Sequence, residues 1–158
     1  MWYGSPAMAR WVAIDHGTKR IGVAAGTDGL GIASPLAVIE AEPQDRAIQT
    51  ILELVEEYRA DGLVVGWPLN MDDSEGPQGR LARAMAAALA TASKLDVRLW
   101  DERLSSFAAK ETLAGRLSRQ KAKARRDAVA AAIVLQDFFS AGGPESAPRP
   151  DEIPTQKP

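Results

Sequence analysis

Residues 11–24 read WVAIDHGTKRIGVA, an apolar run that enters an acid, a histidine and a glycine before the apolar pattern resumes. Two short apolar segments joined by the turn-rich hexapeptide DHGTKR predict an antiparallel β-hairpin. Asp15 then stands where the first buried strand ends. An ionised carboxylate withdrawn from water is costly unless a partner, solvent or a metal ion offsets the loss of hydration.

The chain beyond this hairpin alternates between strand and helix patterns. Apolar residues recur at helical spacing in some segments, and short buried runs bounded by Gly or Pro indicate strands in others. The order indicates an α/β domain with a mixed sheet. The expected elements are strands at 33–39, 63–66 and 96–100, and helices at 44–58, 79–93, 105–114 and 125–140.

The composition is that of an ordinary globular protein. The 158 residues are 46% hydrophobic and 25% charged, which suits one compact domain. A net charge of -2 argues against a uniformly basic surface, so any nucleic-acid site must be local. The absence of cysteine excludes disulfides and thiolate metal ligands, and a single histidine excludes multi-histidine metal centres. No apolar run approaches the roughly 20 residues of a membrane span, so we expect a cytoplasmic protein.

The two ends differ from the middle of the chain. Residues 1–9 mix Gly, Ser and Pro without periodicity, and residues 142–158 are rich in proline and polar side chains. Neither segment offers enough apolar area to offset the entropy of ordering, which predicts disorder for both. The folded domain is therefore expected at residues 10–141.

Acidic residues follow the ends of predicted strands. Asp15 follows the first strand, Asp101 and Glu102 follow the fifth, and Asp127 begins the last helix. Ligands of α/β sheets bind beyond the carboxyl ends of parallel strands, where these acids would meet. Carboxylates from separate segments suit Mg²⁺ or Mn²⁺, and such ions catalyse phosphodiester cleavage, often in pairs.

Each of these acids also has an ordinary structural interpretation. Asp15 could form an Asx turn, and Asp127 could simply stabilise a helix N-terminus. Asp101 and Glu102 could lie in a solvated loop or pair with Arg103. Neighbouring strand residues face opposite sides, so at most one of these two acids should point into a shared site.

Three other features are open to a structural explanation. Asp137 lies ten residues beyond Asp127, about 15 Å along the same helix, and is expected at the surface. A lone histidine such as His16 more often packs or hydrogen-bonds than catalyses. The loop NMDDSEGPQGR at residues 70–80 could close over substrate or be an ordered structural loop.

Basic residues near the predicted acidic cluster could hold phosphates on either side of a scissile bond. The alternative is a solvated helix face, the usual explanation of a charge run. The predicted nucleic-acid contacts are Lys19, Arg20, Arg103, Arg119, Lys123, Arg125 and Arg126.

Four motifs in this order resemble the YqgF/RuvX family of Holliday junction resolvases or pre-16S ribosomal RNA nucleases. They are DHGTKRIGVA, VVGWPLNM with SEGPQ, DERLSS and RRDAVAAAIVLQDF, and the resemblance covers about residues 11–139. The resemblance implies a ribonuclease H-like fold, with a mixed five-stranded sheet, an antiparallel hairpin start and helices on both faces. It matches Asp15, Glu102 and Asp127 to the family's acidic positions, as catalytic residues and metal ligands, and favours Glu102 over Asp101.

The chain departs from the family pattern at a few positions. His16 stands where an aromatic is usual, Trp67 replaces a common Leu, and Ser105 and Ser106 stand where two threonines are frequent. None of these departures removes an acid.

These observations predict a nuclease that depends on Mg²⁺ or Mn²⁺ and acts in 5′-end processing of 16S ribosomal RNA precursors. The alternative is a resolvase of branched four-way DNA, which would favour a two-fold homodimer, whereas an RNA-trimming enzyme can act as a monomer. A catalytically silent RNA-binding module would have less need of all three acids. The Asp-x-Gly-Thr sequence also occurs in actin-like ATPases, but those enzymes need two subdomains around the nucleotide.

Overall fold

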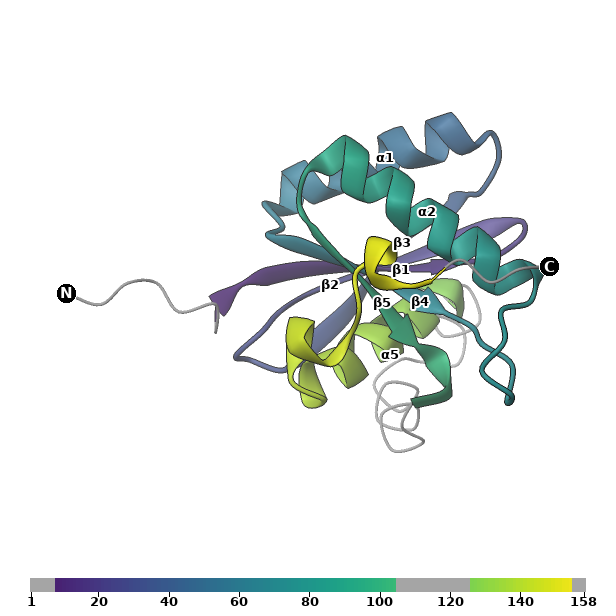
Figure 1. Cartoon of the computed structure of the whole chain (residues 1–158). Helices are drawn as coiled ribbons and strands as arrows, with labels where there is room; N and C mark the ends of the chain where they lie inside the picture. The colour runs from purple at the N-terminus through teal and green to yellow at the C-terminus, as the bar shows by residue number, and fades with distance from the viewer. Residues whose placement is uncertain (1–7, 105–125, 155–158) are drawn as a thin grey trace.

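The computed structural model describes residues 8–104 and 126–154 (Figure 1). Several sequence predictions lie outside these described residues, and the structure adds nothing to them. They concern residues 1–7 and 155–158, the helix at 105–114, and the basic residues Arg119, Lys123 and Arg125.

A five-stranded mixed sheet forms the centre of the fold. Its strand order is β3-β2-β1-β4-β5. β1 pairs antiparallel with β2, which pairs antiparallel with β3, whereas β1, β4 and β5 are mutually parallel. The predicted hairpin and mixed sheet are confirmed. The strands are β1 Arg10–His16, β2 Arg20–Thr27, β3 Ile32–Glu40, β4 Gly62–Trp67 and β5 Asp96–Asp101.

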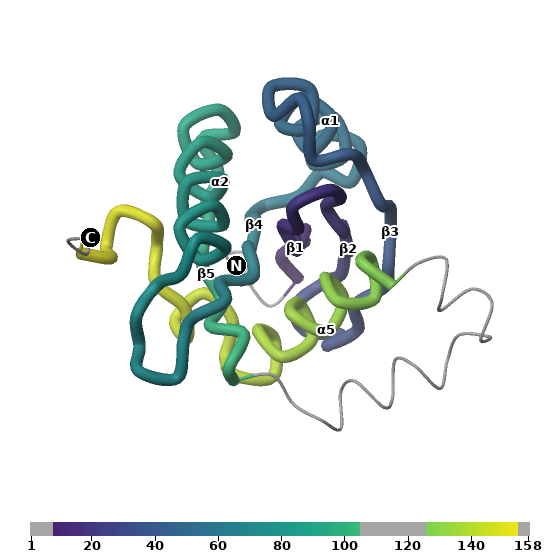
Figure 2. The backbone as a smooth tube through the Cα atoms, turned by 90° about the vertical axis from the view of Figure 1, so that its right-hand side faces the viewer, coloured from purple at the N-terminus to yellow at the C-terminus, as the bar shows by residue number. Residues whose placement is uncertain are grey.

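Helices cover both faces of this sheet, as predicted. α1 (Gln44–Tyr58) and α2 (Pro77–Ser93) lie on one face, and α5 (Arg126–Ser140) lies on the other (Figure 2). Within the described residues, no helix combines the length and apolar character that crossing a membrane requires.

The alternation of β1 divides the core into two layers. Val12 and Ile14 are fully buried in the layer under α1 and α2. Trp11 and Ala13 face α5, where the Trp11 ring lies 4.9 Å from that of Phe138, centroid to centroid. Because successive strand residues point to opposite faces, Asp15 continues the row that faces α5.

Residues 142–154 form an ordered segment, whereas the sequence composition predicts disorder for residues 142–158. It forms two short 3-10 helices, η3 (Gly143–Ser146) and η4 (Pro150–Glu152). The Leu99 backbone N–H donates to the Pro148 carbonyl at 2.8 Å. The Arg98 guanidinium donates to the carbonyls of residues 144 and 147 at 2.8 and 2.9 Å. Backbone acceptors thus attach this segment to β5, and Ala147 and Ile153 add apolar contacts with the core.

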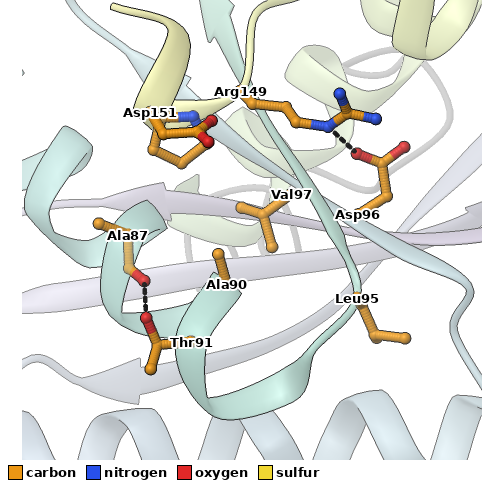
Figure 3. Close-up of a pocket in the computed structure, with 9 residues that line it drawn as sticks. Ala87, Ala90, Thr91, Leu95, Asp96, Val97, Arg149 and Asp151 are labelled. Carbon is orange, nitrogen blue, oxygen red and sulfur yellow. Dashed lines mark hydrogen bonds and ion pairs between the residues drawn. The ribbon is translucent and has the colours of Figure 1, made fainter.

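A shallow hollow of about 400 Å³ lies between this C-terminal segment, α2 and the start of β5 (Figure 3). Arg149 pairs with Asp96 across its rim at 3.4 Å. Asp96 is the first residue of β5, so this hollow lies at the opposite end of the strand from Asp101 and Glu102.

Candidate active site

Asp15 is the penultimate residue of β1 and is half-buried on the α5 side of the sheet. Burial raises the pKa of Asp15 above its ordinary value of 3.8, and the negative charge of Asp127 raises it further. A hydrogen bond with Glu102 and the charge of His16 act in the opposite direction. The structure therefore places the Asp15 carboxyl in contact with Glu102 and within electrostatic range of Asp127.

The two neighbouring acids at the end of β5 have different partners. Glu102 begins the short helix η2 (Glu102–Leu104) and shares a hydrogen bond with Asp15. Asp101 instead pairs with Arg103, whose Nη2 lies 2.8 Å from the Asp101 Oδ2. Only Glu102 is therefore directed to Asp15, as expected for adjacent residues that face opposite sides.

Glycine residues make room for the acids on both sides of Asp15. Gly22 lies opposite Asp15 in the β1–β2 ladder, and a Cβ added there would overlap the Asp127 carbonyl oxygen. A Cβ added at Gly66 of β4 would overlap the Glu102 Oε1. The small size of glycine at both positions brings α5 and Glu102 close to the sheet.

Asp127 lies in the first turn of α5. Arg20 donates from Nε to the Asp127 Oδ2 at 3.2 Å, and both side chains are partly exposed. Lys19, Arg20 and Asp127 line an open hollow of about 180 Å³ together with residues 17 and 18. Arg126 is exposed at the start of the helix. Three of the predicted nucleic-acid contacts thus lie beside Asp127 or next to it in sequence.

The three acids suit a divalent cation by the chemistry of their donor atoms. All are carboxylates, and clustered carboxylates repel until a cation or protons neutralise them. Burial is the main cause of the raised pKa of Asp15, and the charge of Asp127 adds to it. Within the described parts of the chain, however, no group of three or more His, Cys, Asp or Glu side chains is arranged to hold a metal ion. The acids are therefore neighbours without forming a ready three-ligand cage.

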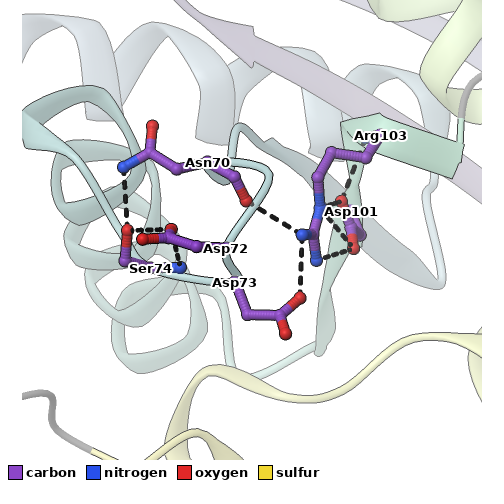
Figure 4. A network of polar contacts seen from close by, with 6 residues as sticks. All are labelled: Asn70, Asp72, Asp73, Ser74, Asp101 and Arg103. Carbon is purple, nitrogen blue, oxygen red and sulfur yellow. Dashed lines mark hydrogen bonds and ion pairs between the residues drawn. The ribbon is translucent and has the colours of Figure 1, made fainter.

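Arg103 connects the end of β5 to the loop after β4 (Figure 4). Its Nη1 donates to the Asp73 Oδ1 at 2.8 Å and to the Asn70 carbonyl at 2.9 Å. Its Nη2 donates to Asp101 at 2.8 Å. These contacts make Arg103 a link within the protein, and its predicted contact with phosphate stays a prediction.

The loop between β4 and α2 is held by contacts within the protein, as in the structural interpretation of residues 70–80. The Asn70 amide donates to the Ser74 hydroxyl at 2.9 Å. Glu75 is buried, where it accepts from the Trp67 indole at 2.8 Å and pairs with Arg83 at 3.0 Å. Glu75 is not among the residues predicted from the sequence, although a carboxylate next to a conformationally restricted Gly-Pro pair is a possible signal of an ordered loop.

The prediction that Asp137 lies at the surface is wrong. Its exposed fraction is 6%, because α5 is apolar around most of its circumference and is covered on several sides. Glu75 and Asp137 are the buried acids of the described residues.

His16 follows Asp15 but points to the other face of the sheet, by strand alternation. Burial lowers the pKa of His16, against the raising effect of the charges of Asp15 and Glu42. A mainly neutral imidazole at neutral pH follows, so His16 is poorly suited to binding phosphate by charge.

The chain is similar in sequence to a known protein family over most of its length. Residues 9–141 match the family described as RuvX, Holliday junction resolvase. A protein of Opitutus terrae named "Putative pre-16S rRNA nuclease" is 44% identical over 146 residues, which cover 90% of this chain and 99% of the relative. A protein of the same name from Chloroflexus aurantiacus is 43% identical over 131 residues, covering 82% of this chain and 86% of the relative.

The fold is shared with solved resolvase structures. Thermus thermophilus RuvC in complex with Holliday junction substrate aligns with a TM-score of 0.58 at 14% identity, covering 88% of this chain and 98% of RuvC. A second structure of Thermus thermophilus RuvC aligns with a TM-score of 0.51 at 17% identity, over 87% of this chain and 98% of RuvC. At such identities the similarity establishes the ribonuclease H-like fold alone.

Proposed function

The chain belongs to the RuvX family, and from this premise we propose that it is a nuclease that hydrolyses phosphodiester bonds during 5′-end processing of 16S ribosomal RNA precursors. The names of the relatives that are 44% and 43% identical support the RNA substrate. The observation that carries the proposal is the contact between Asp15 and Glu102 with Asp127 nearby, at the sheet edge where parallel strands end.

Asp15, Glu102 and Asp127 are the proposed catalytic residues and the proposed ligands of Mg²⁺ or Mn²⁺. A divalent cation at these oxygens would supply activation of water and stabilisation of the leaving oxygen. The shared hydrogen bond lets one carboxyl of the Asp15–Glu102 pair keep a proton while the other is ionised. Arg20 orients the Asp127 carboxylate through their ion pair.

Exposed cations beside the acids are the proposed contacts to the phosphate backbone. Lys19 and Arg20 lie on the hairpin turn next to Asp127, and Arg126 precedes it. Because the chain as a whole carries a net charge of -2, a local cluster is needed to attract a polyanion. The basic stretch that leads to Asp127 in the sequence adds Arg119, Lys123 and Arg125 to the proposed contacts.

Junction resolution is the second candidate function, and the family description favours it. Symmetric cleavage of a four-way DNA needs two active sites related by a two-fold axis, hence a homodimer. RNA trimming requires no such symmetry, so the RNA proposal is compatible with a cytoplasmic monomer.

The experiment that tests both candidates is a side-by-side cleavage assay with a 16S precursor RNA and a four-way DNA junction. We expect cleavage of the RNA with Mg²⁺ or Mn²⁺, no cleavage after chelation of the metal, and no cleavage by the Asp15→Asn protein. Cleavage of the junction alone would replace the RNA proposal with junction resolution. Equal cleavage by the native and Asp15→Asn proteins would refute the proposed active site.

A further inference from the structure

A second hollow opens at the same edge of the sheet, on the face opposite the three carboxylates. Its volume is about 170 Å³, and it lies between the end of β1, the segment before α1 and the first turns of α2. Gln78 of α2 donates to the His16 carbonyl at 3.3 Å, which fixes the end of β1 at this helix. The hollow is lined by His16, Thr18, Ala41, Glu42, Gln44, Leu81 and Ala84.

This hollow combines an apolar wall with a polar rim. Ala41 is buried at its base, and Leu81 leaves 46% of its surface exposed although it is a large apolar residue. Glu42 and Gln44 are exposed at the rim, where they offer a carboxylate and an amide. A carboxylate repels phosphate but accepts hydrogen bonds from N–H groups. The lining therefore suits an uncharged planar group that has an apolar face and N–H donors at its edge.

We propose that this hollow, here named the base pocket, binds one unpaired nucleobase of the substrate strand. The inference rests on the proposed nuclease function and adds a specific contact to it. Unpaired bases are recognised by packing on their faces and by hydrogen bonds to their edges. Leu81 packs against the base, the Glu42 carboxylate accepts from a base N–H, and the Gln44 amide donates or accepts.

The position of the base pocket fits a strand that is cut at the carboxylates. His16 directly follows Asp15, and the two side chains leave β1 toward opposite faces. A strand whose scissile phosphate lies at Asp15 can therefore direct a neighbouring base across the edge of the sheet toward His16. Paired bases of a duplex have their edges occupied, so the pocket favours single-stranded RNA near the cleavage point.

The test is a binding measurement with the full chain, with Ca²⁺ in place of Mg²⁺ so that binding is measured apart from cleavage. The probes are single-stranded RNA oligonucleotides from the 5′ side of the 16S precursor, each with one abasic nucleotide at a successive position. We expect one position at which loss of the base weakens binding about tenfold, as for the loss of one stacked base.

Substitutions on α2 link this effect to the base pocket. Ala84 is exposed and lines the pocket, so Ala84→Phe fills it without disturbing the core. We expect Ala84→Phe to weaken binding of intact RNA about tenfold and to remove the penalty of the abasic nucleotide. Ala87→Phe adds the same ring one turn further along the helix, at an exposed position outside this pocket, and should retain native affinity and the abasic penalty. The double variant Glu42→Ala with Gln44→Ala provides an independent test at two exposed residues.

The outcomes separate this inference from the proposed function. Binding that is insensitive to every abasic position, or an abasic penalty that persists in both the Ala84→Phe and the double variant, would overturn the base pocket and leave the nuclease proposal intact. Failure of the native chain to bind any RNA or four-way DNA would overturn the proposed function and the base pocket together.

Discussion

The two faces of the sheet differ most where β1 and β4 end. On the α5 face, Gly22 and Gly66 flank Asp15, and their small size admits the backbone of α5 and the carboxylate of Glu102. On the α1 and α2 face, Ile14 and Val65 are fully buried in a continuous apolar layer. One face thus places charged groups together at a cost in stability, while the other supplies the apolar burial that offsets this cost.

Asp15→Asn should produce the largest effect on the α5 face. Loss of a carboxylate from the cluster should lower turnover by about a thousandfold or more, as for other groups that act on the reacting atoms. Folding should be retained, because Asn occupies nearly the same volume and carries no buried charge. Turnover and far-ultraviolet circular dichroism of the same preparation measure the two quantities. Native turnover of Asp15→Asn would show that cleavage does not take place at the carboxylates on the α5 face.

Leu89→Ala makes the corresponding change on the opposite face. Leu89 is fully buried on α2, so its truncation should lower the free energy of unfolding by about 3 kcal/mol. Turnover well below the melting temperature should stay near native. Denaturant unfolding and cleavage assays measure the two quantities, and a large loss of turnover without loss of stability would contradict the division between the faces.

Gly66→Ala tests whether residue 66 must lack a Cβ for Glu102 to reach its position beside Asp15. The added Cβ meets the end of the Glu102 side chain, which can move away, so the free energy of unfolding should change by less than about 1 kcal/mol. Turnover should fall by about a hundredfold because a displacement near 1 Å misplaces a catalytic group.

Two other glycines serve as matched references for Gly66→Ala. Gly22→Ala would meet the backbone carbonyl of Asp127, so it should cost about 1–3 kcal/mol of stability in addition to turnover. A Cβ at Gly76 would have its nearest neighbour at 3.8 Å, so Gly76→Ala should change neither quantity appreciably. If Gly66→Ala and Gly76→Ala had the same turnover, the position of Glu102 beside Gly66 would not matter for cleavage.

The smallest expected effect is a dependence of stability on pH. Because the folded pKa of Asp15 is raised, the stability linked to its protonated form is fully present below 3.8 and is lost as pH rises through the folded value. Asp15→Asn should therefore be more stable than the native chain at neutral pH, and this difference should shrink as pH falls toward 3.8. Thermal unfolding of both proteins across this range measures it. A constant difference would mean that Asp15 is not held in a desolvated position.

The local sequence pattern predicts the helices and strands and the sheet edge at which the acids lie. The helix at Gln44–Tyr58 has the predicted bounds, because its apolar residues recur at helical spacing. Parallel strands bring their carboxyl ends to one edge, so Asp15 and Glu102 could be expected together before any coordinates. Residues 8–104 and 126–154 include all three acids, and the contact of Asp15 with Glu102 agrees with that expectation.

Other features depend on tertiary contacts that local pattern does not contain. Asp137 is buried because helix α5 is covered on several sides, whereas a single charge near a helix end resembles a solvated residue. Residues 142–154 were predicted as disordered from low apolar content. These residues are held by carbonyl groups that accept from Arg98 and Leu99, which any residue type can supply, and by the packing of Ala147 and Ile153 against the core.

The segment along β5 also affects how copies of the protein can associate. An edge strand with unpaired N–H and C=O groups can pair with the edge strand of another molecule, which is a common route to aggregation. Here the peptide N–H of Leu99 is already engaged by Pro148, and proline has no N–H with which to extend a ladder. A two-fold assembly that cuts two strands in concert is therefore not expected to form by pairing of two β5 edges.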